Sequence, residues 1–501
     1  MKTLKDKCAL KKFITTPIFY GNGSPHLGHA YTTVLSDAIS RYHKVWMGQD
    51  TFFMTGTDEH GQKIFEKAKS ENITPKELVD KYAQEFKVLD EKLGVQYDRF
   101  IRTTDTDHYE VCKKLWMKMF DAGDLYQKEY VGLYCVGCEG FKTEKDLNEK
   151  GECPDHLKVP VELKEKNWFF RLSKYQDFLQ QKLESNELKV IPEFRKNEML
   201  EFMKEGLQDV SFSRSKELMS WGIPVPNDDT QVMYVWCDAL TNYITGAKVF
   251  TDENNFNSFW QDGETLHVIG KEILRFHSLY WPAMLKSAGF EIPKEILVHG
   301  FITSGGQKMS KSLGNVVLPE HIFEKYSFGE NTSVLACEFP KEIFRYYFLK
   351  NINPHNDGDF TWERLKELYN ADLANGLGNL VSRVMKLSEK YLEPQADFPQ
   401  VDLQKDHPEF AGAMKEYDVM NAMNYIWKQI GEADNYMQTE QPFKVVKVDL
   451  EKGKQQLQFL REKVYTIARL LSPFMPTTSE KIKEIVKANQ MPEMSLFPRY
   501  E

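Results

Sequence analysis

Short strand-like segments alternate with helical segments near the start of this chain. Phe13–Tyr20 is rich in β-branched and aromatic residues, a Gly-Asn-Gly-Ser-Pro turn follows it, and Leu27–Trp46 can form a helix. A second strand is expected at Thr51–Thr55, and Thr74 followed by Pro75 is typical of the start of another helix. Strands that alternate with helices predict an α/β fold with a doubly wound parallel sheet.

The same alternation returns after residue 225. Val232–Trp236, Thr265–Ile269 and Ile296–His299 are short apolar segments, each followed by turn or helix signals. Between the two halves, Leu115–Ile223 departs from the pattern with cysteines, scattered charges and aromatic residues. Its length of about 110 residues is typical of one small domain, so we expect an insertion with its own fold.

Strand signals disappear after about Phe360. Beyond that point, apolar residues recur at helical spacing on two stripes, Val419, Met423, Ile426 and Ile430, and then Leu457, Leu460, Val464, Ile467 and Leu471. Pro473 and Pro476 follow the second stripe and should end its helix. The last third of the chain is therefore predicted to be an α-helical bundle.

Composition excludes several kinds of protein. No apolar stretch approaches the roughly 20 residues of a membrane-spanning helix, and Met1–Lys12 lacks the apolar core of a secretion signal. Seven cysteines are an odd number for a set of disulfides, so we expect reduced thiols and a cytoplasmic protein. The net charge of −9 argues against unselective coating of nucleic acid, although a local basic face can still bind a polyanion.

Polar and glycine-rich segments follow the predicted strands, at the sheet edge where ligands of such folds bind. They are Pro25–His29, Asp58–Gly61, Gly270–Glu272 and Gly305–Ser312. Two histidines three residues apart at a helix start share one face, beside backbone N–H groups suited to phosphate. Two lysines among glycines and hydroxyl groups suit a mobile clamp on the outer phosphates of ATP. Each segment alone is also compatible with a surface turn, and their order in one chain is the stronger signal.

Four potential metal ligands stand in two close pairs within the insertion. Cys135 and Cys138 form the first pair, and Cys153 and His156 form the second. Three thiolates and one imidazole at this spacing can close a tetrahedron around Zn²⁺. Because the protein would fill all four positions, one structural zinc per chain is predicted. The alternative is four ordinary residues of a reduced protein.

Two segments carry a resemblance to a known family. The sequence HLGH at His26–His29 and the sequence KMSKS at Lys308–Ser312 match the HIGH and KMSKS signatures of class I aminoacyl-tRNA synthetases. The chain lacks the Gly-x-x-x-x-Gly-Lys-Ser/Thr loop of ordinary nucleoside triphosphatases. The resemblance implies a Rossmann-like catalytic domain, binding of ATP with Mg²⁺, and an aminoacyl-tRNA ligase of protein biosynthesis.

Further segments resemble the methionine-specific members of that class. Pro17–Gly23, Thr57–Gly61, Tyr234–Trp236 and Ile269–Ser278 look like signatures of the methionyl-tRNA synthetases. The resemblance implies activation of L-methionine by ATP to methionyl-adenylate, with release of pyrophosphate, and transfer to the 3′-terminal adenosine of tRNA(Met). Both initiator and elongator tRNA(Met) would be partners, for initiation and elongation of translation.

The resemblance also assigns site residues, position by position. Asp58 would pair with the methionine ammonium, and the methionine side chain would lie among Ile18, Tyr20, Trp236, Leu240, Tyr243, Ile273 and His277. ATP would contact His26, Gly28, His29, Gly270, Glu272, Lys308 and Lys311, of which His26, His29, Lys308 and Lys311 would be catalytic. Arg214 resembles the family's arginine near the activated carboxylate. Sulfur–aromatic contacts, about 0.3–1.5 kcal/mol each, suit a thioether beside Trp and Tyr.

Simpler explanations exist for some of these residues. The isoleucines and aromatic residues are also typical of a core, and Arg214 of a protein surface. Glu272 stands where the family often has aspartate as partner of the ATP ribose. The insertion leaves little room for a hydrolytic editing domain, so the methionine pocket itself would have to reject homocysteine. A methylene there is worth only about 1–3 kcal/mol.

The helical end resembles the family's anticodon-binding region. Asn379 and Arg383 lie one turn apart on one face of a predicted helix. Phe443 follows Pro442 where the family commonly has tryptophan as a stacking platform for an RNA base. Because the chain ends at Glu501, soon after the last helices, we expect a monomer without the C-terminal dimerisation domain of some relatives.

We therefore expect the catalytic domain in two halves, 1–114 and 225–300, with the zinc-knuckle insertion at 115–224. The KMSKS loop and stem-contact region would be 301–360, and the helical anticodon-binding domain 361–501. Two other interpretations stay open: a class I synthetase for another amino acid such as cysteine, and a zinc-containing tRNA-binding protein on an inactive synthetase fold. Trp236 and Asn379–Arg383 argue against the first, and the intact Lys308–Ser312 against the second.

Overall fold

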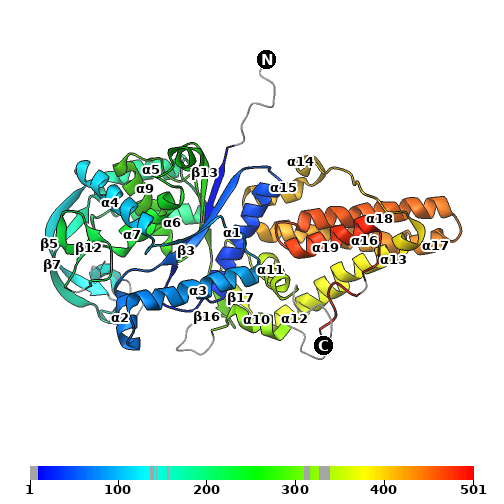
Figure 1. Cartoon of the computed structure of the whole chain (residues 1–501), viewed down its shortest axis with the longest axis horizontal. Helices are drawn as coiled ribbons and strands as arrows, with labels where there is room; N and C mark the ends of the chain where they lie inside the picture. The colour runs from blue at the N-terminus through cyan, green and yellow to red at the C-terminus, as the bar shows by residue number, and fades with distance from the viewer. Residues whose placement is uncertain are drawn as a thin grey trace, which may run out of the picture. The chain divides into compact units, whose positions relative to one another are not determined.

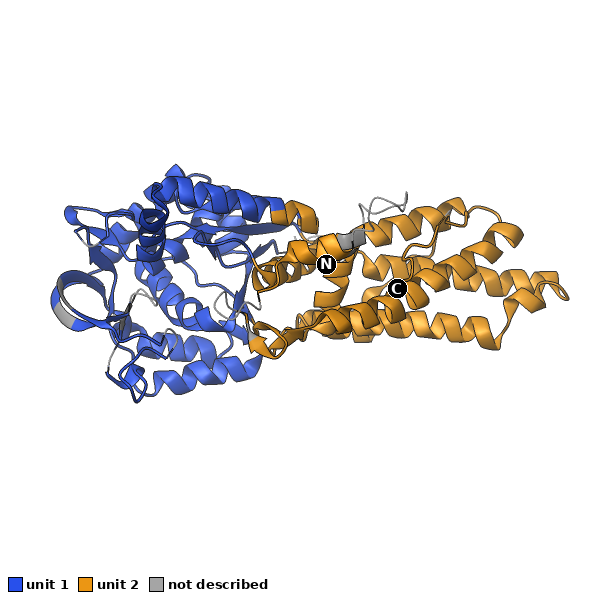
Figure 2. Ribbon diagram, turned by 90° about the horizontal axis from the view of Figure 1, so that it is seen from below, with its two compact units in different colours: residues 1–25, 50–88, 96–298 blue, residues 26–49, 89–95, 299–501 orange. Residues whose placement is uncertain are grey.

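The computed structural model describes residues 10–135, 140–142, 144–154, 157–217, 219–309, 316–326, 339–492 and 494–500 (Figure 1). The chain divides into two compact units (Figure 2). The first comprises 1–25, 50–88 and 96–298, and the second comprises 26–49, 89–95 and 299–501. Each unit therefore combines segments that are far apart in the sequence.

A seven-stranded sheet forms the centre of the first unit, in the order β2-β3-β1-β13-β14-β8, with β4 also paired to β3. The strands are β1 (Lys12–Thr15), β2 (Phe19–Tyr20), β3 (Thr51–Asp58), β4 (Arg99–Arg102), β8 (Lys189–Ile191), β13 (Glu264–Gly270) and β14 (Glu295–His299). β1 pairs in parallel with β3 and β13, β3 with β4, and β14 with β8. The predicted α/β fold with a parallel sheet is confirmed.

Most predicted strands lie where the sequence pattern places them, with two exceptions. The expected strand Phe13–Tyr20 is two short strands, β1 and β2, which both pair with β3. The strand expected at Val232–Trp236 is wrong. Strand β12 (Asp228–Met233) belongs instead to a three-stranded antiparallel sheet with β10 (Ser213–Ser215) and β11 (Pro224–Val225). Trp236 lies in helix α7 (Val235–Gly246). A short buried apolar run has the same composition in a strand and in a buried helix, so periodicity alone cannot separate them.

The first unit also contains helices, one of which, α3, continues into the second unit after residue 88. They are α2 (Gln62–Glu71), α3 (Pro75–Leu93), α4 (Thr106–Asp121), α5 (Gln176–Glu184), α6 (Glu193–Met203), α7, α8 (Glu253–Phe256) and α9 (Trp281–Ala288). The start of α3 at Pro75 confirms the prediction made from Thr74-Pro75. One apolar cluster joins α4, α7, α9 and the sheet, and it includes Trp116, Tyr243 and Trp281.

The expected insertion contributes to three sheets: the three-stranded sheet, through β10, and two others. A four-stranded sheet in the order β6-β5-β7-β9 contains β5 (Leu125–Cys135), β6 (Gly140–Lys142), β7 (Val161–Phe170) and β9 (Val210–Ser211). Strand β8, from the same stretch of sequence, leaves this sheet and pairs with Glu295–Leu297 of β14. The insertion therefore also completes one side of the central sheet.

The second unit contains α1 (Leu27–Val45) and the C-terminal helices. A small sheet joins β15 (Ile302–Ser304) to β16 (Gln307–Lys308) and β17 (Gly358–Phe360). The helices are α10 (Pro319–Tyr326), α11 (Phe339–Asn351), α12 (Trp362–Leu368), α13 (Asn379–Tyr391), α14 (Leu403–Asp406), α15 (Pro408–Lys415), α16 (Val419–Thr439), α17 (Pro442–Val445), α18 (Leu450–Leu471) and α19 (Pro476–Ala488).

The predicted helical bundle is confirmed. Both apolar stripes lie on helices, α16 and α18, and all nine of their residues are buried. Helix α18 ends at Leu471, before Pro473, and α19 begins at Pro476. Among the described residues beyond Phe360 there is no strand. None of the described helices is both long enough and apolar enough to span a membrane.

Candidate functional site

Helix α1 begins with the two histidines of the HLGH segment. The Gly28 backbone N–H donates to His26 Nδ1 at 3.1 Å, and the His26 backbone N–H donates to His29 Nδ1 at 3.2 Å. The two rings stack with centroids 3.7 Å apart. Because each Nδ1 accepts a hydrogen bond, it carries no proton, and the proton of each neutral ring is on Nε2.

Desolvation keeps both rings neutral near pH 7. Burial lowers the pKa of His26 to about 4, and burial together with the neighbouring His26 lowers the pKa of His29 well below its usual value. The first turn of α1 contains no acidic residue. Neutral Nε2–H donors at the positive end of a helix dipole suit the oxygens of a phosphate group.

Glycine at position 28 makes this arrangement possible. A Cβ atom there would lie 3.0 Å from Cε1 and 3.2 Å from Nδ1 of His26. Any larger residue would crowd the imidazole that caps the helix. The structure thus gives a steric reason for the glycine between the two histidines.

The lysine segment begins on a tight hairpin. Ser304 pairs with Gln307, and the two turn residues Gly305 and Gly306 have φ values of 60° and 74°. Glycine adopts these angles without strain. The Gly306 N–H and the Thr303 hydroxyl both donate to Asp359 Oδ1, at 2.8 and 2.7 Å. The anchor of the loop is therefore held to β17.

Lys308 pairs with Thr303 through its backbone. Its side chain lies outside the described residues, and so does the whole of Lys311.

Most residues of the expected methionine pocket lie on or beside α7 in the first unit. Leu240 and Tyr243 are buried, and Ile18, Trp236 and Ile273 pack, partly exposed, on the same apolar cluster. Tyr20 packs instead on a second cluster: Ile64, Ala68, Leu78, Val79 and Tyr82. The structure thus brings five of the predicted apolar and aromatic residues to one cluster.

Two residues of the expected methionine pocket, Tyr243 and His277, form an uncharged hydrogen-bonded pair. His277 Nδ1 donates to the Ile273 carbonyl at 2.9 Å, so its Nε2 accepts from the Tyr243 hydroxyl at 2.7 Å. Burial lowers the pKa of His277 to about 4 and raises the pKa of Tyr243 far above its usual value. A neutral, polarisable surface of this kind suits a thioether better than a charged side chain.

Trp236 stacks on Phe276, with ring centroids 3.7 Å apart and planes 3° apart. Phe276 was not among the predicted residues, although it lies between Ile273 and His277 in a segment that resembles the family. Trp236 is partly exposed, whereas Tyr243 is 1% exposed. An aromatic side chain next to two predicted pocket residues was the signal that could have identified Phe276.

Asp58 ends strand β3 and is buried. Its carbonyl accepts from the Gly21 N–H at 2.8 Å. The next residue, Glu59, is a fully buried carboxylate that accepts from Arg102 Nε at 2.6 Å and from the Thr104 hydroxyl at 2.5 Å. The backbone around Asp58 is therefore held from both sides.

Arg214 lies in β10 and is 7% exposed, which excludes the surface arginine considered from the sequence. Its guanidinium lies 4.2 Å from the Tyr234 ring centroid, and Nη1 donates to the Ser213 carbonyl at 2.8 Å. Hydrogen bonds and ring contact therefore fix the direction of this side chain.

Gly270 is the last residue of strand β13, and Glu272 follows the strand. Glu272 is exposed in the short helical turn Lys271–Ile273. A Cβ atom on Gly270 would lie 2.6 Å from Glu272 Oε2, so the glycine allows the carboxylate to lie against the end of the strand. This places an acceptor for hydroxyl groups where ligands of parallel sheets bind.

Two of the four expected zinc ligands are described, and both are buried. Cys135 ends β5, and Cys153 is 0% exposed. The Cys153 N–H donates to the Lys158 carbonyl at 2.9 Å, and its carbonyl accepts from the Leu157 N–H at 2.8 Å. Cys138 and His156 lie outside the described residues. Buried cysteines at the end of a strand and in a closed loop fit a thiolate metal site.

The expected anticodon residues lie on helices of the second unit. Asn379 is exposed at the start of α13, and Arg383 is partly exposed one turn later. Arg383 Nη1 lies 2.5 Å from Asp434 Oδ1 of α16. Phe443, in α17, is partly exposed. All three side chains can therefore be reached from solvent.

The chain matches known proteins over almost its whole length. Residues 12–162 and 156–385 match the family "tRNA synthetases class I (M)", and residues 393–495 match the "Anticodon binding domain of methionyl tRNA ligase". The methionine–tRNA ligase of Fusobacterium nucleatum is 40% identical, over 97% of this chain and 77% of that protein. The ligase of Thermotoga maritima is 39% identical, over 96% of this chain and 76% of that protein.

A solved structure of methionyl-tRNA synthetase from Mycobacterium tuberculosis, in complex with methionyl-adenylate, is similar with a TM-score of 0.86. It is 34% identical, and the match covers 98% of this chain and 100% of that chain. These relatives are methionine–tRNA ligases, so the interpretation as a synthetase for cysteine is wrong. The chain therefore belongs to the methionyl-tRNA synthetases, the class I ligases that activate methionine with ATP and join it to tRNA.

Proposed function

We propose which residues of this chain act in the two steps of the reaction. In the first, a methionine carboxylate oxygen attacks the α-phosphorus of ATP, the bond to the bridging oxygen breaks, and pyrophosphate leaves. In the second, a ribose hydroxyl of the terminal adenosine of tRNA(Met) attacks the carbonyl carbon of methionyl-adenylate, and AMP leaves. Neither step needs a nucleophile from the protein, so catalysis rests on positioning and charge stabilisation.

His26 and His29 donate from Nε2 to phosphate oxygens as charge develops in the first step. The observation that carries this proposal is that both Nδ1 atoms accept backbone N–H groups, which leaves the proton on Nε2. Because the rings are neutral, they release no proton to the phosphate near pH 7. Removal of one such donor typically costs about 2.7–4 kcal/mol of barrier.

The remaining ATP contacts are assigned from the sequence. Gly28 and Gly270 allow close approach of the nucleotide, and Glu272 accepts from its ribose hydroxyls. Lys308 and Lys311 hold the leaving pyrophosphate, and Mg²⁺ bound to ATP supplies further positive charge. The hairpin at Gly305–Gly306 supports this part because it fixes where the lysine segment begins.

Methionine binds with its ammonium at Asp58 and its side chain against Ile18, Tyr20, Trp236, Leu240, Tyr243, Ile273 and His277. The neutral Tyr243–His277 pair supports a thioether site. Arg214, held by Tyr234 and Ser213, contacts the carboxylate. Rejection of homocysteine then rests on this pocket.

Zn²⁺ is held by Cys135, Cys138, Cys153 and His156, and its chemistry is structural because no ligand position stays open. In the helical domain, Asn379, Arg383 and Phe443 contact the anticodon of initiator and elongator tRNA(Met), with the phenyl ring as a stacking surface.

We further infer a cytoplasmic monomer. The buried free thiols of Cys112 and Cys237 support a reducing compartment.

Amino-acid-dependent ATP–pyrophosphate exchange tests the proposal. We expect exchange with methionine to exceed exchange with cysteine, isoleucine, leucine and homocysteine. Lys311→Ala should slow adenylate formation in a single turnover far more than it weakens methionine binding. Equal exchange with another amino acid would refute the pocket assignment, and weaker binding at an unchanged rate would refute the role of Lys311.

A further inference from the structure

Helix α7 has two faces of different chemistry. Trp236, Leu240 and Tyr243 recur at intervals of four and three residues on the pocket face. Asp238, Thr241 and Thr245 recur at intervals of three and four on the opposite face, and each is only 1% exposed. A polar face that is sealed in a core must find hydrogen-bond partners there.

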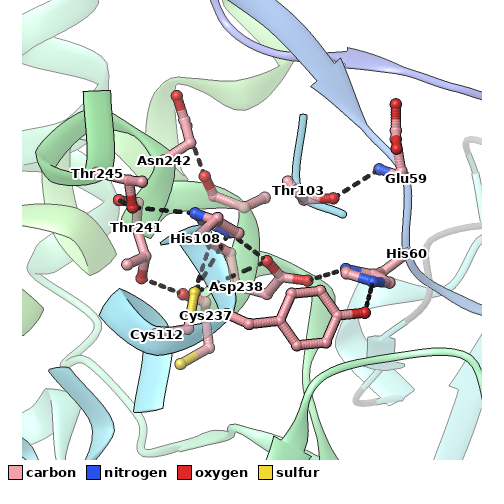
Figure 3. A network of polar contacts seen from close by, with 12 residues as sticks. Glu59, His60, Thr103, His108, Cys112, Cys237, Asp238, Thr241, Asn242 and Thr245 are labelled. Atoms are coloured by element: carbon pink, nitrogen blue, oxygen red, sulfur yellow. Dashed lines mark hydrogen bonds and ion pairs between the residues drawn. The ribbon is translucent and has the colours of Figure 1, made fainter. Parts of the chain in front are cut away.

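Asp238 obtains its partners from two other elements (Figure 3). Its Oδ2 accepts from His60 Nδ1 at 2.7 Å, and its Oδ1 accepts from His108 Nε2 at 2.8 Å. His60 follows β3, and His108 lies in α4. The Tyr109 hydroxyl, also in α4, lies 2.8 Å from His60 Nε2. One carboxylate therefore ties α7 to α4 and to the segment after β3.

Asp238 accepts these bonds as a carboxylate. Burial by itself would raise its pKa, but the charge interaction with His60 and the hydrogen bonds from His108 and His60 outweigh burial and hold the pKa below its usual value. Hydrogen bonds to an ionised group are shorter and stronger than neutral ones. A neutral amide at this position offers only one acceptor oxygen in place of two.

A metal ion is the competing interpretation of the same atoms. One ligand atom each from His108, Cys112 and Asp238 lies within 4.8 Å of the others. However, His108 Nε2 lies 2.8 Å from Asp238 Oδ1 and 3.2 Å from Cys112 Sγ, which are hydrogen-bond distances. Burial also raises the pKa of Cys112 well above its usual value, so the thiol keeps its proton. The group is therefore a hydrogen-bonded network.

The segment next to this network carries Asp58. His60 is two residues after Asp58, and the intervening Glu59 is fixed by its N–H, which donates to Thr103 Oγ1 at 2.9 Å. A shift of His60 would therefore move Asp58 relative to α7. On the proposed pocket, Asp58 and α7 bind opposite ends of methionine.

We propose that Asp238 is a positioning residue for methionine: by holding His60, it fixes the distance between the ammonium site at Asp58 and the side-chain pocket on α7. The inference rests on the proposed methionine pocket. Asp238 then helps to determine which length of substrate side chain the pocket accepts, although it contacts no part of the substrate.

Asp238→Asn tests the inference because it keeps the size of the side chain and removes one acceptor. In ATP–pyrophosphate exchange we expect the KM for methionine to rise about tenfold, as for loss of one hydrogen bond to a charged group. The preference in kcat/KM for methionine over homocysteine and ethionine should fall by a similar factor. The KM for ATP and the rate at saturating methionine should stay close to wild type.

Asp124→Asn is the matched control. Asp124 is also a fully buried carboxylate of the first unit, with partners Lys174, Tyr175 and Ser287, none of them on α7. This variant should lower Tm without a change in methionine KM or in discrimination. If Asp238→Asn behaves in the same way while Trp236→Ala raises methionine KM, the positioning role is refuted and the pocket stands. If Trp236→Ala also leaves methionine KM unchanged, the proposed pocket itself fails.

A second pair of variants covers the case in which Asp238→Asn does not fold. His60→Asn retains an N–H donor near the position of Nδ1, and His60→Ala removes it. We expect discrimination close to wild type in the first and reduced discrimination in the second; equal discrimination in both would overturn the inference. Metal analysis of the purified full chain adds one further test, since an ion that is lost only on Asp238→Asn would establish the metal interpretation instead.

Discussion

At the scale of single residues, His26 has two functions on one ring: Nδ1 caps α1, and Nε2–H is the proposed phosphate donor. Substitution of His26 by Asn or Gln can separate the capping function from the phosphate-donor function. His26→Asn retains a good N-cap acceptor, and should keep the stability of the protein while slowing adenylate formation by about 10²–10³-fold. His26→Gln reaches further and should recover part of the rate. Stopped-flow kinetics measures the rate of adenylate formation, and urea unfolding measures the free energy of unfolding. Equal rates in the two variants would contradict the assignment.

The same ring predicts a dependence of stability on pH. The pKa of His26 is about 4 in the folded protein and about 6.5 without burial, so the unfolded chain binds the proton more readily. The stability from neutral His26 is complete above about pH 6.5 and is lost as the pH falls toward about 4. Urea unfolding at several pH values checks this. His26→Asn should show a shallower decline, and an identical decline would contradict the prediction.

A steric prediction follows for Gly28. Gly28→Ala places a methyl group about 3.0 Å from the His26 ring, in the first turn of a helix that otherwise favours alanine. We therefore expect unfolding stability near that of wild type and a clear loss of adenylation rate. Thermal unfolding measures the stability, and pyrophosphate exchange on the same preparation measures the adenylation rate. A wild-type exchange rate would show that the ring tolerates displacement.

Residue types and spacing in the sequence were enough to predict the residues of the HIGH and KMSKS segments as site residues, because those patterns are local. They did not indicate tautomers, which depend on backbone N–H groups that only a folded helix start provides. Asp238 was also not predicted. Its two partners, His60 and His108, lie 178 and 130 residues away in the sequence, so no local pattern relates them.

At the scale of elements, the hairpin of β15 and β16 owes its shape to two glycines with positive φ. Gly306→Ala forces alanine to φ of about 74°, which costs about 1–2 kcal/mol. We expect a slower pyrophosphate exchange and an unchanged methionine KM. Gly123→Ala is the control, because Gly123 has the same φ of 74° and equally open surroundings, in a turn after α4. It should show the same loss of stability at a wild-type exchange rate.

A buried ion pair joins helix α11 to helix α1 within the second unit. Arg345 is fully buried, lies 2.7 Å from Asp37 of α1, and donates to the Phe474 carbonyl at 2.6 Å. Arg345→Met should destabilise the protein by about 3–5 kcal/mol, toward the lower end because Arg41 also contacts Asp37. Arg364→Met, an exposed partner of Glu367, should change stability by less than about 1 kcal/mol. Chemical denaturation compares the two.

Long elements were predicted better than short ones. The helices that contain Val419–Ile430 and Leu457–Leu471 have several turns of uniform periodicity, and both were placed correctly. The segment Val232–Trp236 has too few residues to distinguish a strand from the start of α7. Strand β8 has three residues and pairs only with the distant β14, so its sequence gives almost no signal.

At the scale of the whole molecule, we expect the fold of the insertion to depend on the proposed zinc ion. One zinc per chain should be found by atomic spectroscopy, and Cys153→Ser should lower the zinc content and make the region around β5 and β7 sensitive to proteases. Because the proposed ligands all lie in that region, methionine-dependent exchange should decline less than zinc content. Equal loss of both would mean that the metal also supports the proposed methionine pocket.

The pairing of β8 with β14 has a consequence for shortened forms of the enzyme. Among the described residues, β14 pairs on one side with β13 and on the other side with β8, a strand from within the expected insertion. A miniature synthetase that joins the two halves of the sheet directly would expose this edge, and an exposed edge strand recruits other chains. We expect such a deletion to form oligomers and precipitate unless Lys189–Ile191 is retained, so the insertion also protects the enzyme against self-association.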